Sequence, residues 1–299
     1  MIKGIAYFSV NNNVACYTQT TPTSEMITRK EFSLIDTEIK ESLHETFEYI
    51  KNNCVEHDYI LFLADGEYQE KYKSSPLRLN PYTIDNKEDR YKDESRQNFF
   101  IKFMQTFYSF PKNRPRTDDN EFRLTMELMI YTHIWESKPI LKQLYRLASL
   151  TNGKSYHWSV EVPEMSKHEF IREDIRDILK NKKLRLAEII TKGFHTSLRN
   201  AFAHSEYQFD NHNKLIHLDT FKGASWDIKN ISFNEWTKRF AYTSLLSYHF
   251  FNERVFRRRR LIDDFGKDEF LIIHPITERK FRTRKIFYEP KWNRFSFDR

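Results

Sequence analysis

Apolar residues recur at helical spacing in successive segments between residues 121 and 256. This spacing is typical of amphipathic helices that bury one stripe against a core. For the first segment, 121–136, the residues on the expected core-facing stripe are Phe122, Met126, Met129, Ile130 and His133. The pattern therefore predicts a mainly α, bundle-like region.

Local signals set the expected ends of these helices. Ser137 is predicted to cap a second helix, with Pro139 in its first turn. Ser166 and Glu169 have the spacing of a capping box, which predicts a helix over 167–180.

The pattern changes once within this region. A long helix is expected from Lys183 to the end of the motif at 199–204. Alternating residues around a polar turn then predict a β-hairpin across 207–219. Ser232 and Glu235 form a second capping box, before a strongly aromatic helix that ends near Val255.

The N-terminal part has a different pattern, with short apolar runs and one segment of helical spacing. Residues 2–10, 14–20 and 59–65 are short apolar runs that predict strands, and 33–53 has helical spacing. The charged segment 66–96 shows little periodicity and is expected to be a loop or mobile insertion.

Four regions follow from these patterns. Residues 1–110 form a small α+β region that ends in a dense aromatic helix or buried segment, and the prolines and charges of 111–120 mark a linker. Residues 121–260 form the helical domain. A basic C-terminal extension, 261–299, contains two short predicted strands.

The composition indicates a folded protein with an uneven charge. Of 299 residues, 39% are hydrophobic and 16% aromatic, which argues against overall disorder. The net charge is +7. Residues 254–299 contain 14 Lys and Arg against 7 Asp and Glu, whereas the first 253 residues hold 35 of each. This surplus is typical of a polyanion-binding surface, although an ordinary solvated basic face has the same composition.

We also expect a soluble, cytoplasmic protein without a membrane partner. The opening segment MIKGIAYFSV is too short for a signal sequence. No apolar run approaches the roughly 20 residues that a spanning helix needs. Cys16 and Cys54 could pair in principle, but two free thiols in a reducing compartment fit this context better.

The segment Arg199–His204, RNAFAH, places polar residues at the end of a strongly apolar helix. Arginine is a permanent cation whose forked donors suit a phosphate. Histidine accepts and donates protons near neutrality, so the two are a minimal set for cleaving a phosphodiester without a metal. A cationic side chain that complements a helix C-terminus has the same residue types, so the spacing alone leaves that alternative open.

No other pattern points to a cofactor or a metal. The sequence contains 11 histidines but no HExxH and no CxxC. His212 and His217 flank a predicted hairpin turn, where such residues more often supply surface polarity than metal ligation. Glycine-rich phosphate loops and the GxSxG elbow of serine hydrolases are also missing.

The segment SLRNAFAHSEYQF, 197–209, resembles the signature of HEPN domains. Ribonuclease members of that family share Arg, a polar residue, three to five further residues and then His. The surrounding order is also similar, with amphipathic helices before the motif and a hairpin, ISFNEW (231–236) and a long helix after it. The resemblance covers about 120–256, and no family is recognised in 1–110 or 261–299.

This resemblance implies a HEPN-like helical bundle with a β-hairpin insertion, which dimerises so that two Arg/His pairs share a cleft. It implies a metal-independent endoribonuclease of a bacterial toxin or anti-phage defence system. His204 would be the acid and base, Arg199 would stabilise the phosphorane-like charge, and Asn200 would orient them. RNA, a second copy and an antitoxin or regulatory protein are the implied partners. The alternative is a non-catalytic HEPN module that binds RNA or nucleotide, or a scaffold in a larger complex.

Two details limit what can be carried over. Arg199 and His204 lie about 140° apart on an ideal helix, so they converge only if Arg199 reaches along the helix or His204 lies where the helix is ending. Toxins that are switched off by tyrosine modification carry Tyr two residues after the His. Here Glu206 is at that position and Tyr207 follows it, so this regulation is not expected.

A second basic segment, RVFRRRR, ends the last predicted helix. Its arginines are Arg254, Arg257, Arg258, Arg259 and Arg260. Favourable placement at a helix C-terminus together with solubility would account for some of them. Because five exceed what capping requires, we expect an RNA-backbone track beside the cleft, with Phe256 or Trp292 as a stacking surface.

Overall fold

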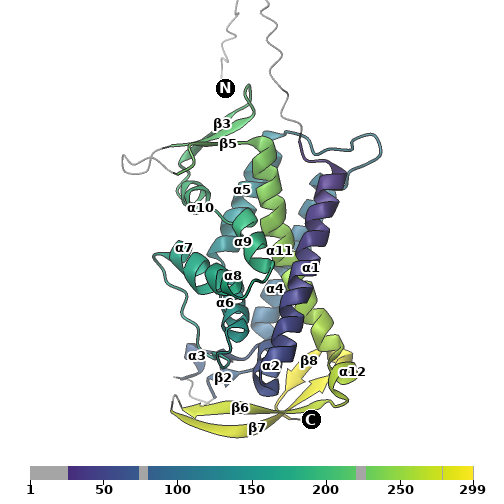
Figure 1. The fold of residues 1–299 in the computed structure, drawn as a ribbon, viewed down its shortest axis with the longest axis vertical. Helices are drawn as coiled ribbons and strands as arrows, with labels where there is room; N and C mark the ends of the chain where they lie inside the picture. Colours follow the sequence, from purple (N-terminus) through teal and green to yellow (C-terminus); the bar gives the residue numbers. More distant parts are fainter. Residues whose placement is uncertain (1–25, 74–79, 220–226, 278, 299) are drawn as a thin grey trace, which may run out of the picture.

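The amphipathic segments of the chain form helices, several of which lie along the longest axis of the molecule (Figure 1). The computed structural model describes residues 26–73, 80–219, 227–277 and 279–298. One small sheet lies at the upper end of the helices in Figure 1, and two lie at the lower end. The predicted strands at 2–10 and 14–20 fall outside the described residues.

The helices are α1 (Arg29–Asn53), α2 (Glu56–Leu63), α3 (Glu70–Lys73), α4 (Lys87–Phe107), α5 (Glu121–Glu136), α6 (Lys138–Thr151), α7 (Lys167–Glu169), α8 (Ile178–Asn181), α9 (Leu186–Gly193), α10 (Thr196–Ala203), α11 (Phe233–Arg259) and α12 (Leu261–Phe265). A π-helical segment, η1 (Phe170–Asp177), joins α7 to α8, and a 3-10 turn, η2 (Pro290–Trp292), precedes the last strand. The mainly α class predicted from the sequence is confirmed.

The strands form three small antiparallel sheets. Their bounds are β1 (Glu67–Tyr68), β2 (Tyr82–Thr83), β3 (Tyr207–Asp210), β4 (Leu215–Leu218), β5 (Asn230–Ser232), β6 (Glu269–Thr277), β7 (Lys280–Glu289) and β8 (Arg294–Ser296). The sheets are β1–β2, β3–β4–β5 and β6–β7–β8. The predicted hairpin and both C-terminal strands are confirmed, and β5 adds a third strand to the hairpin.

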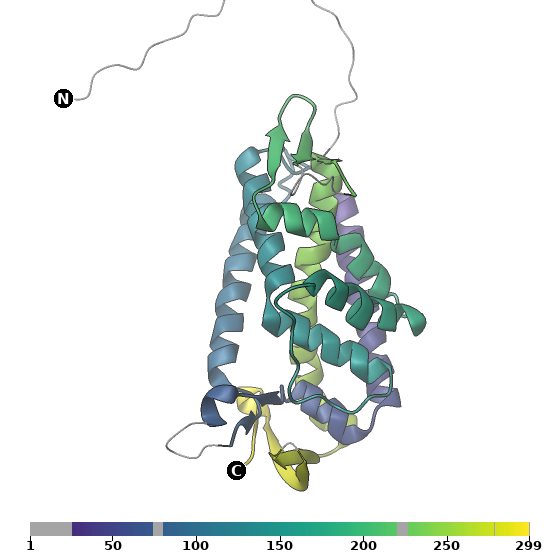
Figure 2. The same ribbon diagram turned by 90° about the vertical axis from the view of Figure 1, so that its left-hand side faces the viewer.

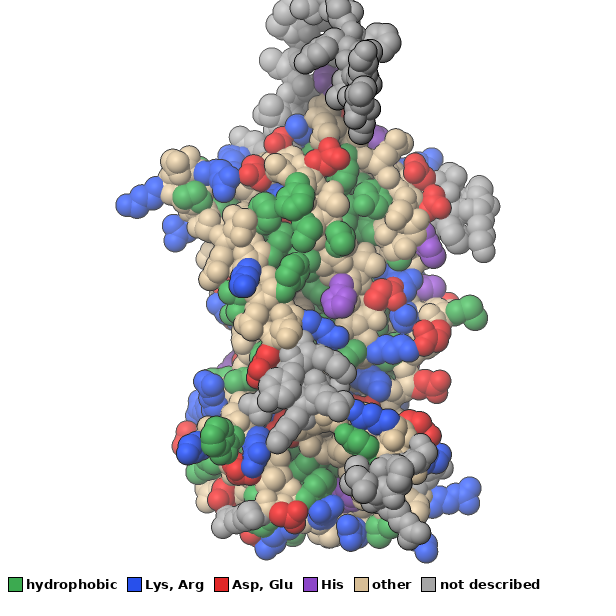
Figure 3. Space-filling view, turned by 180° about the vertical axis from the view of Figure 1, so that it is seen from behind, with side chains coloured by type: hydrophobic (Ala, Val, Ile, Leu, Met, Phe, Trp, Pro, Cys, Tyr) green, Lys and Arg blue, Asp and Glu red, His purple; other side chains and the backbone are tan. Residues whose placement is uncertain are grey.

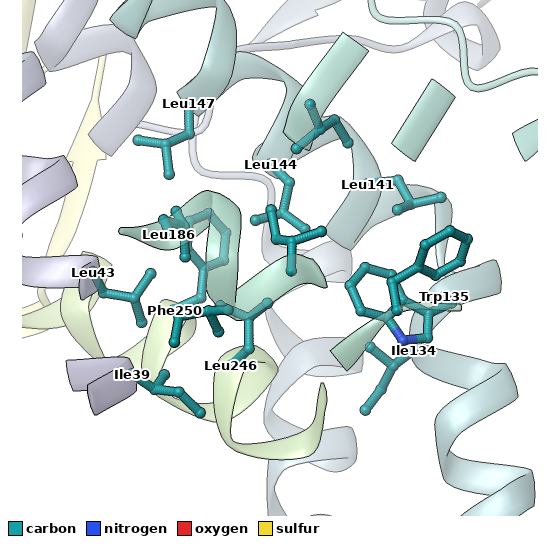
Figure 4. Packing of buried hydrophobic residues seen from close by; sticks show 14 of the residues in the cluster. Ile39, Leu43, Ile134, Trp135, Leu141, Leu144, Leu147, Leu186, Leu246 and Phe250 are labelled. Carbon is teal, nitrogen blue, oxygen red and sulfur yellow. The ribbon is translucent and has the colours of Figure 1, made fainter. Parts of the chain in front are cut away.

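One hydrophobic core runs through the described helices (Figure 4). Ile39 of α1 and Leu246 of α11 belong to it, as do side chains of α5, α6 and α9. The predicted linker 111–120 connects α4 to α5, both of which contribute to this core, and bonds to the start of α1, where Arg29 N–H donates to the Pro115 carbonyl at 2.9 Å. It therefore separates no independently packed region. Figure 2 shows α4 along one side of the bundle.

The described part of the N-terminal region is mainly helical, with the small β1–β2 sheet, and the predicted strand at 59–65 is wrong. Residues 59–63 belong to α2, and Tyr59 to Leu63 are all buried. A short apolar run buried on every side has no alternation that would distinguish a strand from a helix. The predicted loop 66–96 contains β1, α3, β2 and the first half of α4.

Helix α5 has the predicted bounds, but only part of the predicted stripe faces the core, where Ile130 is buried and Met126 is partly buried. Phe122 and Met129 are 65% and 62% exposed. The side chains that face the core include Leu124, Tyr131 and the charged pair of Arg123 and Glu127, which is fully buried. Glu127 also accepts a hydrogen bond from the Tyr108 hydroxyl at 2.6 Å. The hydropathy pattern predicted an apolar buried face, whereas the buried face of α5 includes this ion pair.

One of the predicted helix caps is formed as expected, and two make no side-chain capping bond. The Ser232–Glu235 box at the start of α11 is formed in both directions, and Thr28 and Glu31 form an unpredicted box at α1. Ser166 has a φ of 58° and makes no side-chain capping bond, so the predicted box there is wrong although the helix follows. Ser137 also makes no side-chain capping bond.

Two further expectations concern membrane-spanning helices and the cysteines. Within the described ranges, no helix combines the length and apolar character that crossing a bilayer requires. Cys54 is a free thiol whose pKa burial raises to about 11, while Cys16 lies outside the described residues.

Candidate functional site

The motif helix α10 is separate from α9, which corrects the predicted continuous helix from Lys183. Phe194 and His195 have extended backbone between the two helices. Gly193 ends α9 against α11, where a Cβ would lie 3.0 Å from Thr243 Oγ1. The Thr243 hydroxyl donates to the Gly193 carbonyl at 3.1 Å, so α11 fixes the position of the break.

His204 lies where the helix ends. Helix α10 finishes at Ala203, and His204 is its C-cap residue with φ −103° and ψ 3°. Ser205 then takes a left-handed φ of 58°, which turns the chain toward β3. The predicted position of His204 beyond regular helix is confirmed, and its side chain is exposed.

Arg199 is held by two neighbours of different kinds. Its Nη1 donates to the Asn200 Oδ1 at 2.7 Å, which brings together two of the three predicted catalytic residues. Its Nη2 forms an ion pair with Glu136 at the end of α5. The Arg199 side chain is 14% exposed, and its Nε has no hydrogen-bond partner among the described residues.

Glu136 also forms an ion pair with Lys167, a residue that the sequence did not indicate as part of the site. Lys167 Nζ lies 2.7 Å from Glu136 Oε2, and the Lys167 side chain is only 10% exposed. The carboxylate therefore joins α5, α7 and α10 at one point. No local signal marks this cluster, because its members are 31 or more positions apart in the sequence.

A second histidine, His195, caps the start of α10. Its Nδ1 accepts a hydrogen bond from the Ser197 N–H at 3.2 Å. Burial and the nearby Arg239 guanidinium lower the pKa of His195, which favours the neutral ring that this bond needs. His195 precedes Arg199 by one helical turn, so a polar residue stands at each end of the motif helix.

The arginines at the end of α11 lie far from this site. Phe202 of α10 packs on Trp236 in the first turn of α11, with ring centroids 4.8 Å apart. Arg257 follows Trp236 by 21 positions, which is about 30 Å along the helix axis. The predicted placement of the basic segment beside the motif is therefore wrong.

Most of these arginines are also occupied within the chain. Arg257 is buried between Glu48 and Glu253, and Arg258 is buried against Asp85 at 2.7 Å. They have no surface to offer a phosphate, so the predicted track is wrong for both. Arg254 pairs with Asp65 at 3.4 Å. The exposed members are Arg259 and Arg260.

Comparisons with protein-family models, with curated proteins and with solved structures found no match to this chain. Among the described residues, no group of three or more His, Cys, Asp and Glu side chains has a metal-binding arrangement.

Proposed function

We propose that this protein is a HEPN-type, metal-independent endoribonuclease of a bacterial toxin or anti-phage defence system. The observation that carries the proposal is the position of the motif on α10. Arg199 is bonded to Asn200, and His204 is an exposed residue at the end of the same short helix. The polar motif therefore combines a fixed cation with an exposed acid or base.

The chemistry requires only these groups and the RNA itself. His204 takes the proton from a ribose 2′-hydroxyl, whose oxygen attacks the adjacent phosphorus. The bond from phosphorus to the 5′-oxygen breaks, and an imidazolium returns a proton to that oxygen. Arg199 stabilises the charge that grows on the non-bridging oxygens. The products are a 2′,3′-cyclic phosphate and a 5′-hydroxyl.

A second copy of the chain would supply the second histidine. Helix α5 carries Glu136, which binds Arg199, and presents Phe122 and Met129 to solvent. Figure 3 shows hydrophobic side chains gathered on the upper part of one face of the bundle. An exposed apolar stripe is typical of a protein interface, which supports the homodimer.

The ion pair between Arg199 and Glu136 favours the second candidate, a non-catalytic HEPN module that binds RNA or acts as a scaffold. A carboxylate beside the arginine competes with a phosphate for the same donors. If this pair persists in the presence of RNA, Arg199 has a structural role.

The experiment is cleavage of end-labelled RNA in excess EDTA, with the product ends identified. We expect cyclic phosphate ends, no cleavage of the 2′-deoxy substrate, and a loss of about 10²–10⁴-fold for His204→Ala. Arg199→Ala should lose about 10²–10³-fold.

Matched controls separate catalysis from stability. His212→Ala removes an exposed histidine of the hairpin turn, and Arg185→Ala removes an exposed arginine between Glu41 and Glu45. Both should cleave at the wild-type rate. Activity that EDTA abolishes, or that survives both motif substitutions, contradicts the mechanism.

A further inference from the structure

A cavity of about 240 Å³, lined by both charged and apolar side chains, lies away from the motif helix, between α4, α6 and α11. The turn that follows α2 contributes Asp65, and β1 contributes Glu67. An adjoining cavity of about 230 Å³ shares Asp65 and Arg254 with it. Both volumes are below the roughly 300–1,000 Å³ of sites for drug-sized ligands, which restricts an occupant to a small molecule.

The acidic groups of this cavity already have cationic partners. Glu67 lies 2.8 Å from Lys142 Nζ and 2.5 Å from Arg146 Nη2. Asp65 bonds to Gln143 and lies 3.4 Å from Arg254 Nη2. Burial would raise the pKa of the Asp65 carboxyl, but Arg254, Arg146 and Arg258 hold that pKa below its usual value. Because both carboxylates are already paired, a cationic ligand is not favoured in this cavity.

Four buried polar atoms of the lining residues lack hydrogen-bond partners among the described residues, two of them cationic donors and two of them amide acceptors. Arg146 is 1% exposed, yet its Nη1 has no hydrogen-bond partner among the described residues. The same holds for Arg254 Nε. The side-chain carbonyl of Gln143, which is 8% exposed, is an acceptor without a donor, and so is that of Gln97. Each unsatisfied buried group is costly, so these two donors and two acceptors favour a ligand that offers both acceptors and donors.

The backbone adds two features to the cavity. Asp65 has a left-handed φ of 54°, a conformation that few non-glycine residues adopt without a functional or structural reason. The first turn of α6, from Lys138 to Ile140, also lines the cavity. The positive end of this helix dipole favours negative charge nearby.

We propose that this cavity binds a small organic anion that carries hydroxyl or amino groups. Its phosphate or carboxylate oxygens accept hydrogen bonds from Arg146 Nη1 and Arg254 Nε, and its hydroxyl or amine donates to Gln143. Ile140 and Phe250 supply an apolar wall for the carbon skeleton. The site does not depend on the ribonuclease proposal, because no motif residue contributes to it.

The test is thermal unfolding of the full chain with four probes at constant ionic strength. The probes are ribose 5-phosphate, gluconate, inorganic phosphate and neutral ribose. An anion at roughly tenfold over its Kd should raise Tm by about 3 °C, and ribose should not change it. Ribose 5-phosphate and gluconate distinguish a phosphate ester from a carboxylate as the preferred anion, and either result supports the site.

Two variants localise the effect. Ser247→Met should fill the cavity without removing a charge, since Ser247 lines it from α11, and should abolish the shift. Arg254→Lys keeps the charge but removes Nε, and should weaken binding about tenfold by calorimetry. Arg185→Lys, on the exposed surface, should bind as the wild type does.

The proposal is overturned if no anion raises Tm, or if Ser247→Met responds as the wild type does. Should Ser247→Met fail to fold, the Arg254→Lys titration decides. A response to inorganic phosphate alone that Arg254→Lys leaves unchanged means ion binding elsewhere, and it also overturns the proposal.

Discussion

At the scale of single residues, charged side chains in this protein are placed by partners that are remote in the sequence. Arg199 and Lys167 come from different helices and share the carboxylate of Glu136. Arg257 and Arg258 look like a basic surface in the sequence, but they neutralise Glu48, Glu253 and Asp85 inside the bundle. A charge that is buried and paired is costly to leave alone.

Removing the shared carboxylate should therefore destabilise the protein. Glu136→Ala leaves the mostly buried Arg199 and Lys167 without their anion, and we expect the free energy of unfolding in urea to fall by about 1–3 kcal/mol. Glu164→Ala is the control, because Glu164 is 76% exposed in its pair with Lys138. It should change stability by less than about 0.5 kcal/mol, and equal losses would contradict the assignment.

At the scale of elements, each long helix of the α1–α11 pair begins with a capping box, and α11 also contacts the box of α1. Glu31 bonds to the Thr28 N–H at 2.9 Å and lies 2.8 Å from Lys238 of α11. Lys238 and the Thr28 backbone lower the pKa of Glu31 to about 2. The helix start and its packing partner are thus stabilised by one ionised carboxyl.

This arrangement predicts a specific acid sensitivity. Because the folded pKa of Glu31 lies below its unfolded value of 4.5, its contribution is complete above about pH 4.5 and is lost as the pH falls toward 2. Glu31→Gln should flatten the fall in stability over this window by about 1 kcal/mol, a value reduced for the 40% exposure of Glu31. Denaturant unfolding at pH 5, 4 and 3 measures it. A wild-type slope in the variant would exclude the assignment.

At the scale of the whole molecule, the bundle leaves one apolar stripe of α5 uncovered. Phe122 and Met129 are exposed, although the core contains Leu124 and Tyr131 of the same helix. Phe99 of α4 is also 51% exposed. This uncovered stripe lies on the helix whose Glu136 binds Arg199, and it is the surface that the proposed dimer would use.

A charge on this stripe should separate the two copies. We expect a dimer for the wild type and a monomer for Phe122→Asp by size-exclusion chromatography with light scattering, with ribonuclease activity lost together with the dimer. Leu34→Asp alters an equally exposed residue of α1, which is 61% exposed, and should stay dimeric. A monomeric wild type, or a dimeric Phe122→Asp variant with full activity, would refute this interface.

The parts of the fold that depend on near neighbours could be predicted. The bounds of α5, the box at Ser232 and Glu235, the hairpin and the end of α10 at His204 all depend on residues a few positions apart. The break between α9 and α10 could not be predicted, because it depends on Thr243 of α11, 50 positions after Gly193.

The sequence by itself determined a mainly helical chain and the position of Arg199, Asn200 and His204 at a helix end, because hydrophobic spacing and caps act locally. Only the tertiary structure decided which face of α5 is buried, that α2 is a helix, and which arginines are neutralised. It also placed Glu136 beside Arg199 and formed the cavity between α4, α6 and α11. These outcomes depend on contacts between distant segments, and such contacts leave no periodic trace in the sequence.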